Sequence, residues 1–109
     1  MKYAIAIDFD GTLCEKAEYP EIGKPRMKVI EEAKKRKSEG CALILYTCRE
    51  GEYLYAALEW LKKYDLTFDA VNENLAERIE HFGNDCRKIG ADEYWDDRSV
   101  NPEIFDRKQ

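Results

Sequence analysis

The sequence lacks any apolar run of the roughly twenty residues that a membrane-spanning helix needs. Its first apolar run, residues 3–7, is ended by Asp8 and Asp10, so the N-terminus does not have the form of a secretion signal. Together these absences predict a cytoplasmic protein that does not enter a membrane.

The sequence also lacks paired cysteines and an excess of positive charge, and it contains a single histidine. The four cysteines, Cys14, Cys41, Cys48 and Cys86, form no CxxC pair, which argues against a zinc site and predicts free thiols in a reducing compartment. His81 is the only histidine and is expected at the surface. The 18 Lys and Arg residues against 23 Asp and Glu residues give a net charge of −5, which does not favour nonspecific binding of nucleic acid.

The apolar residues that are present form short runs that alternate with amphipathic segments. Strands are expected at residues 3–7, 41–46, 68–71 and 93–95, and helices at residues 25–39, 52–64 and 75–81. Alternating strands and helices form a mostly parallel sheet with right-handed crossovers. A chain of 109 residues has room for one core, and no insertion is long enough for a lid. We therefore expect one α/β domain over residues 1–109, a three-layer Rossmannoid fold without a cap.

The segment Asp8-Phe9-Asp10-Gly11-Thr12 carries the strongest functional signal. It follows the first strand, and ligands of open α/β sheets bind beyond the carboxyl ends of the strands. Two carboxylates at this spacing can bind a hard cation and present one oxygen as a nucleophile. A calcium loop of the EF-hand type would need a further acid at Thr12 and a glutamate at Tyr19, so that alternative is excluded.

Reactive side chains follow the other strands as well. Thr47 and Arg49 follow residues 41–46, Asp96 and Asp97 follow residues 93–95, and Lys88 lies in the segment before that last strand. The carboxyl ends of parallel strands share one edge, so these groups are expected to converge. Carboxylates suit Mg²⁺, the cations can neutralise phosphoryl oxygens, and the Thr47 hydroxyl can donate a hydrogen bond to one. The sequence therefore predicts a site for Mg²⁺ and a phosphate group.

These motifs, in this order, resemble the four motifs of the haloacid dehalogenase (HAD) superfamily. The resemblance implies that Asp8 attacks phosphorus to form an aspartyl-phosphate, and that Asp10 protonates the leaving oxygen and later activates water. It implies Mg²⁺ ligands from Asp8, the main-chain carbonyl of Asp10, and Asp96 and Asp97. Contacts to the phosphate or substrate are expected from Gly11, Thr12, Thr47, Cys48, Arg49 and Lys88. An acid at position 10 is typical of the phosphatases and phosphomutases of this superfamily, and not of its dehalogenases or transport ATPases.

Four segments narrow the resemblance to small capless HAD phosphatases and hydrolases of bacteria and phages. They are residues 19–23, 47–51, 87–92 and 95–98. The expected activity is Mg²⁺-dependent hydrolysis of a phosphomonoester, either a small molecule or the end of a polymer. Without a cap the site should be open, which suits a bulky substrate or shielding by another subunit of a homo-oligomer.

Two other functions remain open at this point. Residues 47–50 and 96–98 resemble segments of polynucleotide 3′-phosphatase domains, so a polynucleotide 3′-phosphatase or a nucleotide phosphatase is an alternative, although the acidic net charge does not favour nucleic acid. An alternative of another class is a module that binds phosphate or assembles subunits without catalysis.

The roles of several single residues are also open. Arg49 contacts the substrate or pairs with a neighbouring surface acid. Asp96 or Asp97 binds the metal directly, and the sequence does not decide which. Arg98 contacts the substrate or forms a structural salt bridge. Tyr19, in the loop beside the nucleophile, either gates the site or only packs within the loop.

Overall fold

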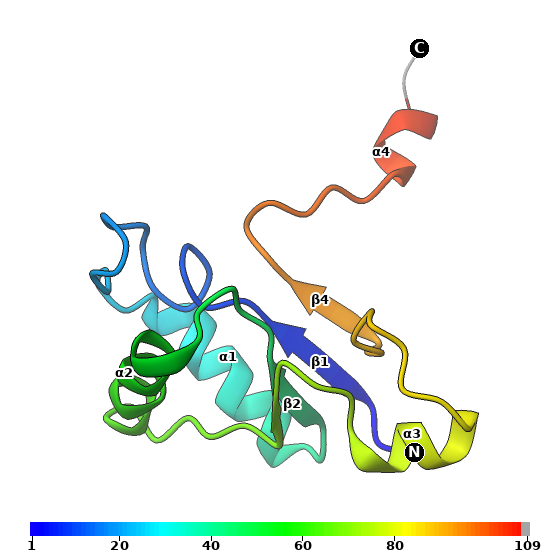
Figure 1. The fold of residues 1–109 in the computed structure, drawn as a ribbon. Coiled ribbons are helices and arrows are strands. Elements are labelled where there is room, and N and C mark those ends of the chain that lie inside the picture. Colours follow the sequence, from blue (N-terminus) through cyan, green and yellow to red (C-terminus); the bar gives the residue numbers. More distant parts are fainter. Residues whose placement is uncertain (108–109) are drawn as a thin grey trace.

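The structure, a computed structural model, describes residues 1–107. Four parallel strands form a single sheet in the order β3-β2-β1-β4, with helices between successive strands (Figure 1). The strands are β1 (Ala4–Ile7), β2 (Ala42–Leu45), β3 (Ala70–Val71) and β4 (Glu93–Trp95). The helices are α1 (Met27–Ser38), α2 (Gly51–Lys62), α3 (Ala76–Phe82) and α4 (Glu103–Asp106).

The predicted fold class is confirmed. Each predicted strand and helix is present with bounds close to those expected, and the sheet is parallel throughout. The described residues contain no cap domain between the elements of this α/β core. Helix α4 was not predicted, because four residues are too few to show a helical period.

One face of the sheet carries large apolar side chains and packs against two helices. Successive strand residues point to opposite faces, and Ile5, Ile7, Leu43 and Leu45 belong to one core cluster. That cluster also contains Ile30 and Ala33 of α1 and Ala57 and Leu61 of α2. The crossovers from β1 to β2 and from β2 to β3 run in the same direction, so right-handed connections place α1 and α2 on the same face.

The other face carries small side chains and a thinner layer. Ala4, Ala6, Ala42 and Ile44 form a second cluster with Leu75 and Ile89. The chain between β3 and β4 passes back across the sheet, so α3 belongs to this face and lies apart from α1 and α2 (Figure 1). The three layers are thus a pair of helices, the sheet, and the segment around α3.

Glu93 ties the edge strand β4 to helix α1. Its carboxylate accepts hydrogen bonds from Arg36 Nη2 at 2.5 Å, Tyr3 Oη at 2.6 Å and Trp95 Nε1 at 2.9 Å. The hydrogen bond from Arg36, followed by those from Tyr3 and Trp95, lowers the pKa of Glu93 to about 2. The carboxylate form of Glu93 is therefore favoured by folding.

This pKa predicts a loss of stability in acid. A carboxyl whose pKa is lowered by folding stabilises the protein above its ordinary pKa of 4.5, and that stabilisation disappears as the pH falls toward 2. The variant Glu93→Gln should lose about 1 kcal/mol at pH 7, a small value because the ion pair is partly exposed, and the deficit should vanish near pH 2. Urea unfolding at both pH values measures this, and an equal deficit at both would contradict the account.

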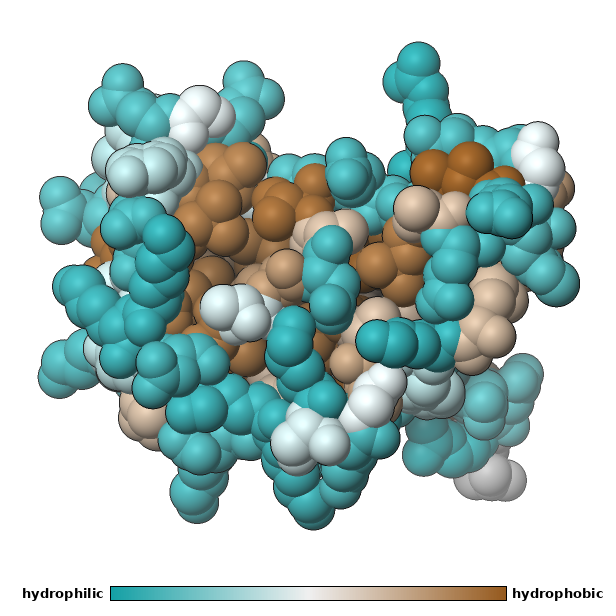
Figure 2. Space-filling view, turned by 90° about the horizontal axis from the view of Figure 1, so that it is seen from below, coloured by the Kyte–Doolittle hydropathy of each residue, from teal (hydrophilic) through white to brown (hydrophobic). Residues whose placement is uncertain are grey.

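The surface is mixed in character. Figure 2 shows one face on which apolar side chains gather toward the middle, with hydrophilic side chains around them. Charged residues make up 38% of the sequence, which accounts for this hydrophilic rim. Among residues 1–107, no helix has the length and apolar character needed to cross a bilayer.

Candidate active site

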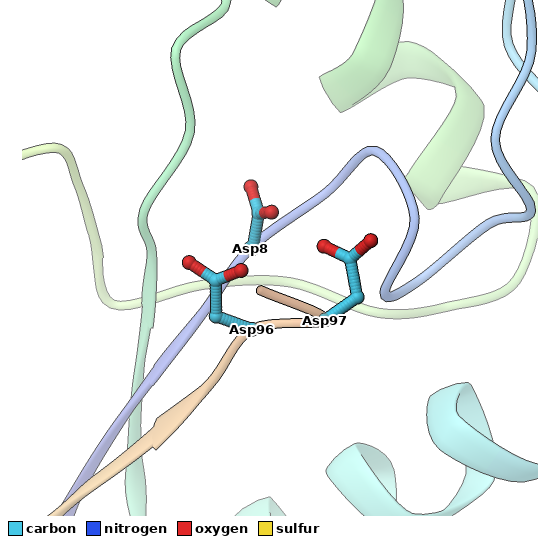
Figure 3. A group of neighbouring side chains, drawn as sticks. All are labelled: Asp8, Asp96 and Asp97. Atoms are coloured by element: carbon cyan, nitrogen blue, oxygen red, sulfur yellow. The ribbon is translucent and has the colours of Figure 1, made fainter. Parts of the chain in front are cut away.

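Three carboxylates meet at the carboxyl edge of the sheet. Asp8 directly follows β1, and Asp96 and Asp97 directly follow β4, its neighbour in the sheet. The Asp8 main-chain N–H donates to the Trp95 carbonyl at 2.9 Å, which continues the ladder to the point where both strands end. One oxygen of each carboxylate lies within 4.8 Å of the others. Figure 3 shows the three side chains pointing to the same side with their carboxylates close together, so the predicted convergence of Asp8 with Asp96 and Asp97 is present.

This acidic cluster fits a hard divalent cation. Three carboxylates at this separation repel one another, and Mg²⁺ is usually bound by a few carboxylates together with water. Burial, with the charges of Asp96 and Asp97 nearby, raises the pKa of Asp8 to about 6. The donor set contains only oxygen, which suits Mg²⁺ and does not suit zinc.

Gly11 and Thr12 hold Asp97 in place. The Asp97 main-chain N–H donates to Thr12 Oγ1 at 3.1 Å, and the Thr12 side chain is buried. Gly11 has φ of +86°, and a Cβ built there would lie 2.5 Å from Asp97 Oδ2. Position 11 therefore requires glycine both for its backbone conformation and for the approach of the carboxylate. Thr12, predicted to bind phosphate, positions Asp97 in this structure and does not line the cavity that contains Asp8.

Gly11→Ala should disturb the acidic cluster of Asp8, Asp96 and Asp97 in addition to straining the backbone at position 11. Gly83 is the matched control, since its φ is +76° and a Cβ there meets nothing within 4 Å. Both alanine variants should lose about 1–2 kcal/mol of stability because of positive φ. Only Gly11→Ala should lose most of the rise in melting temperature produced by added Mg²⁺, because the new methyl group displaces Asp97. Equal Mg²⁺ responses in thermal melts of the two variants would contradict this role of Gly11.

The side chain of Asp10 does not join the acidic cluster. It forms a bidentate ion pair with Arg49, in which Arg49 Nε donates to Asp10 Oδ2 at 2.8 Å and Arg49 Nη2 donates to Asp10 Oδ1 at 2.9 Å. Each oxygen keeps a second lone pair, and the side chain remains 37% exposed. A metal contact from Asp10 would therefore come from its main-chain carbonyl, as the family resemblance implied.

Arg49 corrects one prediction. It was expected to contact phosphate or a neighbouring surface acid, but its side chain is only 1% exposed, and its Nε and Nη2 groups donate to Asp10. Nη2 also donates to the carbonyls of Pro20 and Glu21, both at 3.1 Å. The hydrogen bonds to Asp10 raise the pKa of Arg49, so it stays charged although buried. Arg49 is a positioning residue that joins Asp10 to the loop between β1 and α1.

A cavity of about 520 Å³ opens over these groups. Asp8, Asp10 and Asp96 line it together with Thr47 and Cys48, which follow β2. Lys16, Ala17, Tyr19, Tyr46 and Arg98 complete the lining. Thr47 is fixed on both sides, because its N–H donates to Asn72 Oδ1 at 2.8 Å and its Oγ1 accepts from the Arg49 N–H at 3.1 Å. The predicted residues Asp8, Asp10, Thr47 and Cys48 are thus brought to one cavity.

Lys88 lies in a neighbouring cavity of about 570 Å³. Its Nζ is 5.5 Å from the centre of the Tyr94 ring, and the side chain is exposed. The two cavities share Tyr46 and Asp96 in their walls. Lys88, predicted to contact phosphate, lines this neighbouring cavity and not the one that contains Asp8 and Asp10.

One solved structure shows a close likeness to this chain. It is that of a conserved protein from Bacteroides thetaiotaomicron, with 37% sequence identity and a TM-score of 0.78. The match covers 100% of this chain and 94% of that chain. This chain belongs to the same family as that protein. No family model and no curated protein matches the sequence.

Three further residues contribute to the site and were not predicted from the sequence. Lys16 forms a 3.6 Å ion pair with Asp97, Asn72 holds Thr47, and Tyr46 lines both cavities. Asn72 and Tyr46 each directly follow a strand, which was the available signal. Lys16 has no comparable signal, because it lies in an irregular loop whose path depends on tertiary contacts.

Proposed function

We propose that this protein is a capless phosphatase of the HAD superfamily that hydrolyses phosphomonoesters with Mg²⁺. The proposal rests on the different surroundings of the two neighbouring acids, Asp8 and Asp10. Asp8 is turned toward Asp96 and Asp97, while Asp10 is held by Arg49, and both line one cavity. This difference supports Asp8 as the nucleophile and Asp10 as the group that exchanges protons.

In the first step, an Asp8 oxygen attacks phosphorus and the ester P–O bond breaks with its electron pair on the leaving oxygen. Asp10, in its protonated form, donates a proton to that oxygen, so an alcohol leaves and an aspartyl-phosphate remains. In the second step, water attacks phosphorus and gives a proton to Asp10. The bond between phosphorus and Asp8 breaks, which releases inorganic phosphate and restores the Asp8 carboxylate.

Charge on the phosphoryl group is met by the surrounding residues. Asp8, Asp96 and Asp97 would hold Mg²⁺, which offsets the repulsion between the phosphate and the attacking carboxylate. Thr47 lines the cavity, which supports its hydroxyl as a donor to a phosphoryl oxygen. Lys16 and Arg98 line the same cavity and supply positive charge, and Lys88 supplies it from the neighbouring one.

The openness of the cavity and the free cysteines support proposals about the substrate, the assembly and the compartment. The cavity has no cap over it within residues 1–107, which supports either a small phosphorylated molecule or the end of a polymer as substrate. A second copy of the chain shielding the site is compatible with this openness. The four cysteines are free thiols, which supports the cytoplasm as the place of action.

Phosphate release from an aryl phosphate tests the proposed activity. With added Mg²⁺ the protein should release phosphate through many turnovers, and a chelator should stop the release. Restoring Mg²⁺ should restore the rate, while an equal concentration of Na⁺ should not. Tight binding of phosphate esters without turnover at saturating Mg²⁺ would contradict the proposal and indicate a binding module instead.

A further inference from the structure

Two exposed tyrosines border the site cavity, and phosphate chemistry does not account for them. Tyr19 is 55% exposed and Tyr46 is 41% exposed, and both line the cavity that contains Asp8 and Asp10. Tyr46 directly follows β2, while Tyr19 lies in the loop between β1 and α1. Two separate parts of the chain therefore present aromatic rings beside the nucleophile.

The Tyr19 ring is held by its neighbours although it is exposed. The guanidinium carbon of Arg49 lies 5.1 Å from the ring centre, and the Tyr53 ring meets it edge-on at 5.6 Å. Arg49 also donates to the carbonyl of Pro20, the next residue, which anchors the backbone beside the ring. The exposed ring is thus preorganised, so a ligand that stacks on it has little side-chain freedom to remove.

The same guanidinium fixes the ring relative to the reacting acid. The Arg49 guanidinium carbon lies over the Tyr19 ring and, at 5.2 Å from the ring centre, over Phe9, while Nε donates to Asp10. The aromatic ring and the proton-transfer group are therefore parts of one rigid unit. A ligand on Tyr19 is placed at a fixed distance from the site of phosphoryl transfer.

The cavity also offers the charge and volume for a large anion. Lys16 and Arg98 line it, and its volume of about 520 Å³ lies within the usual range for small-molecule sites. Aromatic faces with adjacent cations bind the planar rings and phosphates of nucleotides. A small aliphatic phosphate would leave the aromatic part of this wall without a partner.

We propose that the phosphate ester bound at this site carries a nucleobase that stacks on Tyr19. The proposal rests on the proposed function for the fate of the phosphate, but base binding is measurable without turnover. The shared chemistry is a base linked through a ribose or deoxyribose to a terminal phosphate. Its source is a free nucleotide or the end of a nucleic acid.

Calorimetric titration of the Asp8→Asn variant tests this, because it reports binding whether or not the protein hydrolyses anything. With Mg²⁺ present, adenosine monophosphate should bind at least about tenfold more tightly than ribose 5-phosphate. Adding Tyr19→Leu should remove that difference without weakening ribose 5-phosphate, whereas Tyr19→Phe should preserve it. Tyr55→Leu is the matched control, since Tyr55 is 65% exposed on α2 and does not line the cavity.

Each outcome has one meaning. Equal affinity for the nucleotide and the sugar phosphate, or no effect of Tyr19→Leu, would overturn the proposal. A short oligonucleotide with a terminal phosphate that binds tenfold more tightly than the mononucleotide would identify nucleic-acid ends as the source, and weaker binding would identify free nucleotides. Base-dependent binding together with an inactive wild-type protein would refute the phosphatase function and leave this inference standing.

Discussion

Asp8→Asn is expected to abolish phosphate release and, at the same time, to stabilise the metal-free protein. An amide oxygen is a poor nucleophile, so turnover should fall by about 10⁴-fold or more, as for other catalytic nucleophiles. Stability should rise because the variant removes one of three mutually repelling carboxylates. Opposite changes in activity and stability are typical of functional sites and not of residues that only support the fold.

The pH dependence gives the sign of the stability effect. The pKa of Asp8 is raised from 3.8 to about 6 by folding, so the charged form destabilises the native state above pH 6. The metal-free wild type should gain stability as the pH falls from 7.5 toward 4, and Asp8→Asn should lack this part of the gain. At pH 7.5 the variant should be more stable by about 1 kcal/mol, a value reduced for solvent screening.

Chemical unfolding in a chelator and a phosphatase assay in Mg²⁺ measure the two effects. Glu31→Gln on α1 is the matched control, because it removes the same charge from an exposed position outside the site. It should change neither activity nor stability by a measurable amount. Activity retained in Asp8→Asn, or a loss of stability in that variant, would contradict the assignment of Asp8.

Arg49→Ala is expected to cause a large loss of stability. The change leaves the Asp10 carboxylate unpaired and removes the donor to the carbonyls of Pro20 and Glu21. Breaking a fully buried ion pair costs about 3–5 kcal/mol, and the loss here should lie at the lower end because the Asp10 side chain is 37% exposed. Arg49→Lys should recover only a minor part of the lost stability, because an ammonium group cannot reproduce the bidentate contact with Asp10. Lys62→Ala, which removes an exposed ion pair with Glu59, should cost less than about 1 kcal/mol.

A double-mutant cycle with Asp10→Asn separates the ion pair from the loop contacts. If Arg49 acts through Asp10, the two substitutions together should cost clearly less than the sum of their separate effects. The folded Arg49→Lys protein should also lose about tenfold to a hundredfold in turnover, because Asp10 is no longer held in position. Additive stability losses with unchanged turnover would show that Arg49 serves the loop alone.

The fold was predictable because its elements carry local signals. The apolar runs that became β1 and β2 are buried on both faces, as expected of central parallel strands. Strand β4, with three residues, was still located because Asp96 and Asp97 mark its end. Helix α4 had no such marker and was missed.

The site was predictable where function depends on strand ends, and less so where it depends on loops. Sheet topology alone brings Asp8 to Asp96 and Asp97. The role of Arg49 depends on the path of residues 11–24, whose carbonyls reach it only in the folded chain. Lys88 lies in an irregular segment before β4, so its spacing from the strand did not fix the cavity that it lines.

The central claim is that Asp8 carries the phosphoryl group during turnover. Acid quenching of the reaction in Mg²⁺, followed by mass spectrometry of the peptide that contains Asp8, tests it directly. The account predicts a peptide heavier by one phosphoryl group, removable with hydroxylamine and absent from Asp8→Asn. Rapid phosphate release with no modified peptide at any quench time, or with the label on another residue, would contradict it.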